Sequence, residues 1–150
     1  MPDILHRITI KSPPGRVYEA LSTAEGVRNW WTRETVLDTA EGGFGEFSFC
    51  GGKNVKRVRI EKLSPGAEAV WKVVASSAQP YWEGTVISFQ LRAEDGVTVL
   101  NFSHRGFREE SESFAMTSTG WAYFLVSLQQ LLEKGRGAPA PDVDFAQLIA

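Results

Sequence analysis

A long amphipathic segment near the C-terminal end constrains the fold more than any other part of this sequence. From about Ser113 to Lys134, the residues of one helical face recur at steps of four, three, four, three and four. Because residues three or four apart share a face of an α-helix, this spacing predicts one helix with a continuous buried stripe. The stripe consists of Phe114, Ser118, Trp121, Leu125, Leu128 and Leu132. Another part of the chain must therefore cover it.

The sequence also predicts where this helix ends. Lys134 suits the negative end of the helix dipole, and Gly135 suits the left-handed residue that often follows a helix. The segment from Gly137 to Pro141 is too rich in glycine and proline to continue it. We therefore expect residues 1–138 to form a single domain and residues 139–150 to form a loosely attached C-terminal tail.

The N-terminal segment predicts a strand followed by helix. Apolar residues alternate from Ile4 to Ile10, which is the period of a half-buried strand. Ser12 is expected to cap the next helix, in which Pro13 and Pro14 occupy positions where a missing N–H costs little.

Helical spacing then continues as far as a pair of tryptophans. The apolar positions that carry it are Val17, Ala20, Leu21 and Ala24. Gly26 is expected to divide this region into two short helices, the second of which ends at Trp30 and Trp31.

The middle of the chain, from about residue 34 to residue 105, predicts an antiparallel meander. Short β-rich runs are separated there by three turn signals, and strands joined so tightly must be antiparallel neighbours. The first signal is suited to a two-residue turn and the second to a type II turn. The signals are Gly51-Gly52, Ser64-Pro65-Gly66-Ala67 and Glu94-Asp95-Gly96.

Alternation within these strands predicts which side chains face inward. The clearest sets are Thr85, Ile87, Phe89 and Leu91 on one strand, and Thr98, Leu100, Phe102 and His104 on the next. The earlier strands fit the same scheme with Phe47 and Phe49, Val58 and Ile60, and Trp71 and Val73. One strand, two short helices, a meander and a long helix together predict an α+β fold in which the sheet buries one face against the long helix.

The pattern of charged residues argues against binding to a polyanion such as nucleic acid. Lys53, Lys56, Arg57 and Arg59 alternate with apolar residues, which is expected of one solvated strand face rather than a basic block. The formal net charge is −2. We therefore expect no nucleic-acid partner.

Composition also limits the chemistry and the compartment. A single cysteine, Cys50, excludes an internal disulfide, and the only histidines are His6 and His104, so we expect neither a metal site nor a cofactor. Charges interrupt the apolar residues at the start too early for a signal peptide, and no run is long enough for a membrane span. A cytoplasmic location is expected.

The order of these motifs matches a known family. The matching residues near the start are Ser12-Pro13-Pro14, Val17-Tyr18-Glu19-Ala20-Leu21, Trp30-Trp31, Gly42-Gly43 and Glu83-Gly84-Thr85 before Ile87 and Phe89. Those near the end are His104-Arg105-Gly106-Phe107, Gly120-Trp121, Phe124-Leu125, Ser127-Leu128 and Leu132-Glu133 before Gly135. Over about residues 3 to 138, the chain resembles the AHSA1-like branch, named for an activator of Hsp90 ATPase, of the START/SRPBCC (Bet v 1-like) superfamily.

The resemblance implies the helix-grip fold, in which a curved antiparallel sheet wraps the long C-terminal helix and leaves a cavity. Members of the superfamily bind lipids, sterols, polyketides or hormones there. The leading hypothesis is therefore a non-catalytic carrier or sensor of a small hydrophobic molecule, as a monomer or a homodimer. No residue is predicted to be catalytic. The expected ligand-binding residues are Trp30, Trp31, Phe47, Phe49, Trp71, Glu83, Thr85, Ile87, Phe89, Leu100, Phe102, His104, Trp121, Leu125 and Leu128.

Two alternatives stay open. The chain is an enzyme like the polyketide cyclases and aromatases of the superfamily, with His104 or Glu83 as the acid–base group, or it is an interaction module for an Hsp90-related co-chaperone or stress-response role. Some of these residues also have a purely structural interpretation. His104 is then a core histidine bonded to backbone, Glu83 meets solvent at a strand end, and Trp30 and Trp31 plug the core instead of gating the cavity.

Overall fold

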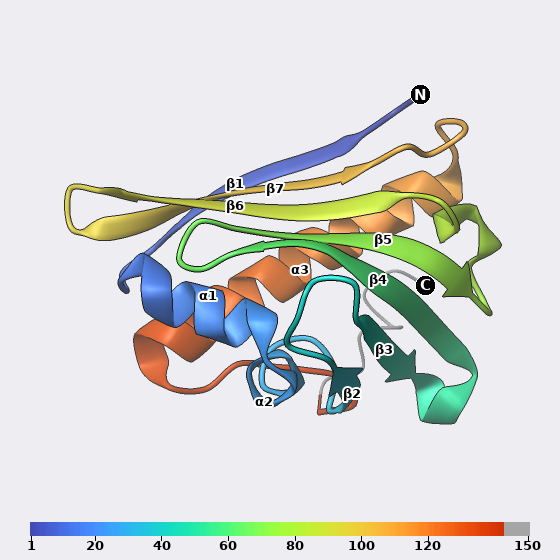
Figure 1. Ribbon diagram of the computed structural model, residues 1–150. Coiled ribbons are helices and arrows are strands. Elements are labelled where there is room, and N and C mark those ends of the chain that lie inside the picture. Colours follow the sequence, from blue (N-terminus) through green and yellow to red (C-terminus); the bar gives the residue numbers. More distant parts are fainter. Residues whose placement is uncertain (143–150) are drawn as a thin grey trace.

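The long helix lies along one antiparallel sheet in the computed structural model, which describes residues 1–142 (Figure 1). Seven strands form this sheet in the order β1-β7-β6-β5-β4-β3-β2. The strands are β1 (Ile4–Ile10), β2 (Glu34–Leu37), β3 (Phe44–Phe49), β4 (Asn54–Ser64), β5 (Glu68–Ser76), β6 (Val86–Glu94) and β7 (Val97–Arg105). The helices are α1 (Pro14–Ser22), α2 (Ala24–Arg28) and α3 (Glu112–Lys134), and they gather on one side of the sheet. The predicted helix-grip α+β fold is confirmed.

The predicted end of α3 is confirmed, and its start lies within one residue of the expectation. Ser111 caps its first turn by accepting the N–H of Phe114 at 3.1 Å. At the other end Gly135 has φ 80°, and its N–H reaches the carbonyl of Leu131. None of the helices within residues 1–142 has the length and hydropathy that crossing a membrane requires.

Two of the three predicted turns have the expected form. Gly66 has φ 73° and Ala67 donates to the carbonyl of Ser64, as a type II turn requires. Asp95 and Gly96 both have positive φ, which suits the two-residue link between β6 and β7. The Gly51-Gly52 prediction is wrong in length, because Phe49 pairs with Asn54 and the loop between them holds four residues.

The break between the first two helices lies at Thr23 rather than at the predicted Gly26. The Thr23 hydroxyl caps α2 by accepting the N–H of Gly26 at 3.0 Å. Gly26 serves close packing instead, since a Cβ there would lie 2.6 Å from the Cα of Ala20. Ser12 is not the cap of α1, because Pro13 holds that position and the Ser12 hydroxyl is buried without a partner among the described residues.

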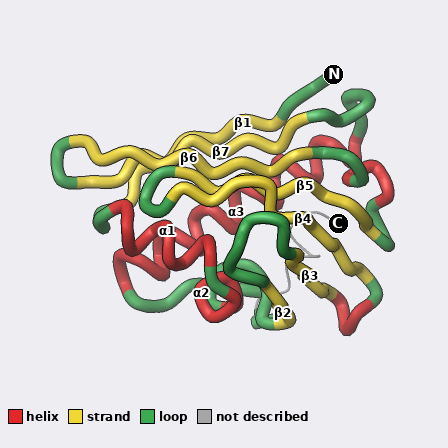
Figure 2. Tube along the Cα trace, viewed as in Figure 1, coloured by secondary structure: helices red, strands yellow, loops and turns green. Residues whose placement is uncertain are grey.

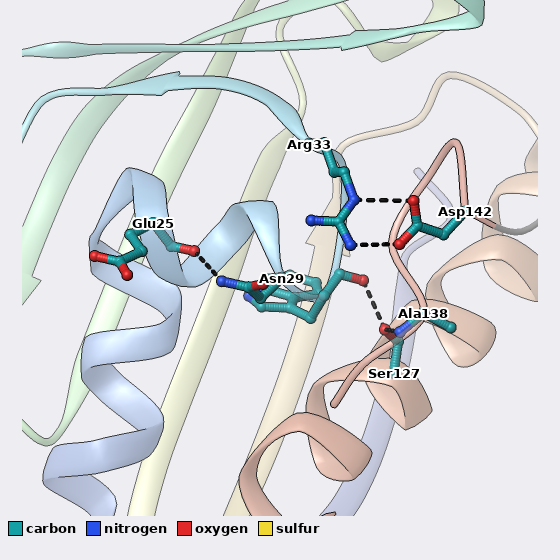
Figure 3. A network of polar contacts seen from close by, with 7 residues as sticks. Glu25, Asn29, Arg33, Ser127, Ala138 and Asp142 are labelled. Carbon is teal, nitrogen blue, oxygen red and sulfur yellow. Dashed lines mark hydrogen bonds and ion pairs between the residues drawn. The ribbon is translucent and has the colours of Figure 1, made fainter. Parts of the chain in front are cut away.

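The segment after α3 is docked against the fold. Residues 137–142, here called the strap, run along the start of β2, where the N–H of Ala140 donates to the Trp31 carbonyl and the N–H of Arg33 donates to the Ala140 carbonyl. Arg33 also pairs with Asp142 (Figure 3). The expected loose tail is therefore wrong for residues 139–142, while residues 143–150 of that prediction lie outside the described residues.

Ser127 joins the strap, α3 and the α2–β2 connection. Its buried hydroxyl donates to the Trp30 carbonyl at 2.8 Å and accepts the N–H of Ala138 at 2.7 Å (Figure 3). Gly137 beside it has no room for a side chain, because a Cβ would lie 2.3 Å from the Asn29 carbonyl oxygen. The strap therefore fits at this point only as backbone.

We expect Ser127→Ala to lower the free energy of unfolding by about 1–3 kcal/mol, because it leaves the buried Trp30 carbonyl and the partly buried Ala138 N–H without their partner. Thr119→Ala is the control, since Thr119 is exposed and, within residues 1–142, its hydroxyl bonds the Ala115 carbonyl of its own helix. Urea unfolding of the two variants measures the difference, and the control should stay within about 0.5 kcal/mol of the native chain. Equal losses would mean that the strap contributes nothing through Ser127.

Candidate functional site

Aromatic rings fill the space between α3 and the sheet. The ring centroid of Trp121 lies 4.5 Å from that of Phe102 and 4.9 Å from that of Trp31. Trp31 in turn lies 4.5 Å from Phe47, and Phe89 lies 5.1 Å from Trp71. These separations are direct contacts. At Trp121 the expected hollow under the helix is therefore occupied by the protein's own side chains.

Most of the predicted ligand-binding residues belong to this buried layer. Trp30 and Trp31 are 0% and 2% exposed, so they plug the core, which was one of their two sequence interpretations. Phe49 differs from the rest because it is half-buried. The other fully buried members are Phe47, Trp71, Thr85, Ile87, Phe89, Leu100, Phe102, His104, Trp121, Leu125 and Leu128.

Glu83 does not face inward. It is exposed, and its carboxylate accepts the N–H of Ser76 at 3.4 Å. The strand alternation that suggested an inward position does not extend to it, because β6 begins only at Val86 and Gly84 has φ 83°. Glu83 therefore has the solvent-facing position that was its alternative interpretation.

His104 is held in the core by two side chains. The indole N–H of Trp121 donates to its Nδ1 at 3.0 Å, so Nε2 carries the proton of the neutral ring and donates to the Thr85 hydroxyl at 2.7 Å. That hydroxyl donates onward to the Trp82 carbonyl. Burial, reinforced by the charge of Lys56, lowers the pKa of His104 to about 3. Both ring nitrogens are occupied, so the geometry is that of a structural histidine.

Lys56 is a buried ionisable group that the sequence pattern did not reveal. Its side chain was assigned to a solvated strand face, yet it is 2% exposed and shares the inner face of β4 with Val58 and Ile60. The signal was present in the alternation, since positions 56, 58 and 60 share one phase. Lysine is rarely buried alone, and that general rule favoured the wrong interpretation.

The Lys56 amine lies among amide oxygens and aromatic rings. Nζ donates to Asn54 Oδ1 at 2.6 Å and to Gln79 Oε1, and it lies 4.4 Å from the ring centroid of Trp82 and 5.3 Å from that of Phe49. Burial lowers the pKa of Lys56 to about 7, against a smaller opposing effect of Cys50. The amine is therefore near its midpoint of protonation at neutral pH.

Loops rather than α3 close the sheet around this amine. The β3–β4 loop and the β5–β6 loop both lie at the right-hand side of the molecule in Figure 2. Gln79, from the second loop, links Nζ to the Tyr81 hydroxyl at 2.8 Å. We call Phe49, Lys56, Gln79, Tyr81 and Trp82 the Lys56 end. Trp82 connects it to the core, because its ring also lies edge-on to His104 at 4.7 Å.

A β-bulge places an unexpected hydroxyl beside Lys56. In the β4–β5 pairing, Lys56 lies opposite Ser76 and Val58 opposite Val73, so β5 carries one extra residue between these pairs. Ser76 thereby joins the inner face, 4% exposed, and its Oγ has no hydrogen-bond partner among the described residues. Strict alternation along β5 from Val73 would place Ser76 on the outer face, so a sequence pattern alone misses it.

The outer face of the sheet carries a separate groove. Its volume is about 560 Å³, and side chains of β1, β5, β6 and β7 line it, among them Leu5, Arg7, Gln90 and Ser103. It is open to solvent and lies on the side of the sheet away from α3, because these residues alternate with the buried ones. No pattern in the sequence indicates this groove.

The fold defines this chain as a helix-grip domain of the START/SRPBCC, Bet v 1-like kind. The family model described as activator of Hsp90 ATPase homolog 1-like protein matches residues 11–133, and the chain belongs to this family. A comparison with curated proteins finds no match.

Solved structures share the whole architecture. The Aha1 dimer from Colwellia psychrerythraea is 36% identical, with a TM-score of 0.81 over 91% of this chain and 100% of that one. Protein MLL2253 from Mesorhizobium loti is 21% identical, with a TM-score of 0.80 over 89% and 98% of the two chains. A protein from the dynemicin biosynthetic locus is 16% identical, with a TM-score of 0.74 over 90% of this chain and 48% of that one. The last two show the fold alone.

We expect the His104 ring to show no chemical-shift titration between roughly pH 5 and 8, where an unperturbed histidine changes charge. Its pKa is lowered from 6.5 to about 3, so on acidification the unfolded chain binds a proton that the folded chain does not. His104 therefore destabilises the fold increasingly as the pH falls from 6.5 towards 3. NMR of the ring resonances tests this, and a midpoint near 6.5 would contradict the neutral, locked ring.

We expect Lys56→Met to raise the free energy of unfolding at pH 6 by about 1–4 kcal/mol, because it replaces an isolated buried charge with an apolar side chain of similar size. The pKa of Lys56 is lowered from 10.5 to about 7, so the cost of the charge is complete below pH 7 and disappears as the pH rises towards 10.5. The gain should shrink over that interval.

Chemical denaturation between pH 6 and pH 10 measures this dependence. Lys53→Met is the matched control, since Lys53 is exposed and adjoins the same strand, and it should change stability by less than about 0.5 kcal/mol. A Lys56→Met variant less stable than the native chain at pH 6 would show that the ammonium is net stabilising.

Proposed function

We propose that this chain binds a small apolar molecule at the Lys56 end and acts as a non-catalytic carrier or sensor. One observation carries the proposal. The aromatic interior comes to the surface there, since Phe49 and Tyr81 are only half-buried, and it does so around a polar group that can orient a ligand. Small-molecule sites typically combine apolar walls with a few placed polar groups.

The site we propose lies at the end of the grip, because the rings around Trp121 are in direct contact with one another under the middle of the helix. The apolar part of the ligand contacts Phe49 and Tyr81, and its polar part reaches Lys56. Entry requires the β5–β6 loop to move, since Gln79 and Trp82 cover the amine. Besides the bond from Lys56 to Gln79, hydrogen bonds between Ser77 and Val55, at 2.9 and 3.0 Å, attach this loop to β4.

The enzymatic alternative has less support from the geometry. A cyclase or aromatase needs an acid–base group that titrates near neutral pH and faces the substrate. His104 has both nitrogens occupied and a pKa near 3, and Glu83 is exposed outside the buried layer. These were the two groups on which that alternative depended.

The interaction alternatives rest on the family. Its description names an activator of Hsp90 ATPase, and the relative from Colwellia psychrerythraea is described as a dimer, which supports the homodimer over the monomer. An Hsp90-related or stress-response role and a cytoplasmic location stay predictions. Stimulation of Hsp90 ATPase by the purified chain would support the co-chaperone alternative.

Titration of ¹⁵N-labelled protein with decanamide and 2-naphthamide tests the proposed binding. We expect the amide signals of Phe49, Gln79 and Tyr81 to move with at least one of these neutral probes, because the probe packs on their rings. Gln90 and Ser103, in the outer groove, should stay unchanged. Movement confined to the outer groove would overturn the proposal, as would no movement with these amides and with the corresponding acids, decanoate and 2-naphthoate. Native mass spectrometry of protein from its own source would identify a retained ligand.

A further inference from the structure

The charge of Lys56 is offset in part by the rings of Trp82 and Phe49 and by a small effect of Cys50. The ion pairs formed within residues 1–142 do not include it, and its two hydrogen-bond acceptors are neutral amide oxygens. A buried cation without a counter-ion is costly, and most proteins pair it or avoid it. An ammonium has three N–H donors, and only two of them have oxygen acceptors here. The third has no oxygen acceptor among residues 1–142, where the neighbours of Nζ are otherwise the rings of Trp82 and Phe49. An oxygen atom of a ligand could therefore accept it.

Ser76 lies opposite Lys56 on the neighbouring strand, and it too lacks a hydrogen-bond acceptor among the described residues. Residues opposite one another in an antiparallel pair project from the same face with Cβ atoms about 5 Å apart. The Ser76 hydroxyl is buried and has no partner among residues 1–142. Two unsatisfied donors, one charged and one neutral, therefore lie side by side on neighbouring strands.

We infer that Lys56 and Ser76 together bind the carboxylate of an apolar acid. A carboxylate has two oxygens, one for the ammonium and one for the hydroxyl, and its single negative charge matches the single positive charge of the site. A phosphate monoester would bring up to two charges against one cation. This inference rests on the proposed function and adds the chemical class of the ligand's head group.

The rings around the amine strengthen the pair once it forms. Phe49 and Trp82 exclude water from two sides of Nζ, and charge interactions are stronger where water is excluded. The oxygen of Gln79 now occupies part of the position that a carboxylate would take. Because Gln79 belongs to the β5–β6 loop, movement of this loop would both break the hydrogen bond between Gln79 and Nζ and open the site to the ligand.

Calorimetric titration with matched acid and amide probes tests the inference. Decanoate is compared with decanamide, and 2-naphthoate with 2-naphthamide, at pH 6, where Lys56 is protonated. We expect at least one acid to bind the native chain about tenfold more tightly than its amide, because only the acid forms the charge-assisted hydrogen bond. Lys56→Met should reduce the difference to about twofold or less while it still binds the amide.

Ser76→Ala has an unusually close control in Ser12→Ala. Both remove a buried hydroxyl that lacks a partner among the described residues, but only Ser76 faces Lys56. We expect Ser76→Ala to weaken binding of the acid about threefold to tenfold and Ser12→Ala to leave it unchanged. Equal effects of the two variants would remove Ser76 from the site.

The same titrations at pH 8 give an independent readout. Cys50, in the β3–β4 loop, is the ionisable group that acts on the pKa of Lys56, and Lys56 in turn acts on His104, which lies across Trp82. The Glu83 carboxylate is also near the site, since it accepts the N–H of Ser76 at 3.4 Å. The pKa of the free amine is about 7, so affinity for the acid should fall about tenfold between pH 6 and pH 8, while affinity for the amide stays constant.

The possible failures are distinguishable. Equal affinity for acid and amide, unaffected by Lys56→Met, would overturn the inference and leave the proposed function standing. Absence of binding by all four probes would overturn both.

Discussion

The contact of Trp121 with the inner face of the sheet is the constraint on which the rest of the structure depends. Large aromatic rings fill the space between the curved sheet and the long helix on its inner side. Trp121 touches Trp31 from the α2–β2 connection and Phe102 from β7, so three distant parts of the chain meet at one indole. Its N–H also fixes the tautomer of His104.

The sequence predicted the elements well, because they depend on periodicity and turn chemistry. The α3 stripe, the alternation of β6 and β7 and the Gly66 and Gly96 turns are local patterns with one physical meaning each. The site was predicted less well. Lys56 has the phase of an inner-face residue, but the general rarity of buried lysine overrode that phase.

Other parts of the site could not be predicted locally at all. Ser76 faces inward only because a β-bulge shifts the register of β5, and the bulge is a property of the pairing rather than of either strand. Trp82 lies in a loop, where no periodicity indicates direction. His104 and Lys56 are both buried and polar, but His104 has a hydrogen-bond partner for each ring nitrogen, whereas the hydrogen bonding of Lys56 is incomplete. The partners that make this difference come from segments far apart in the chain. Composition and residue spacing therefore do not show which of the two buried groups is fully hydrogen-bonded.

The strap changes where this domain should be considered to end. The family match stops at residue 133, one residue before the end of α3, and a boundary drawn from sequence similarity would separate the helix from the segment that follows it. The backbone of residues 137–142 nevertheless supplies hydrogen bonds to Trp31 and Arg33 and fills a space that admits no side chain at Gly137. An expression boundary placed at the edge of the family match would thus remove part of the packed structure, so the folding unit of this chain reaches at least Asp142.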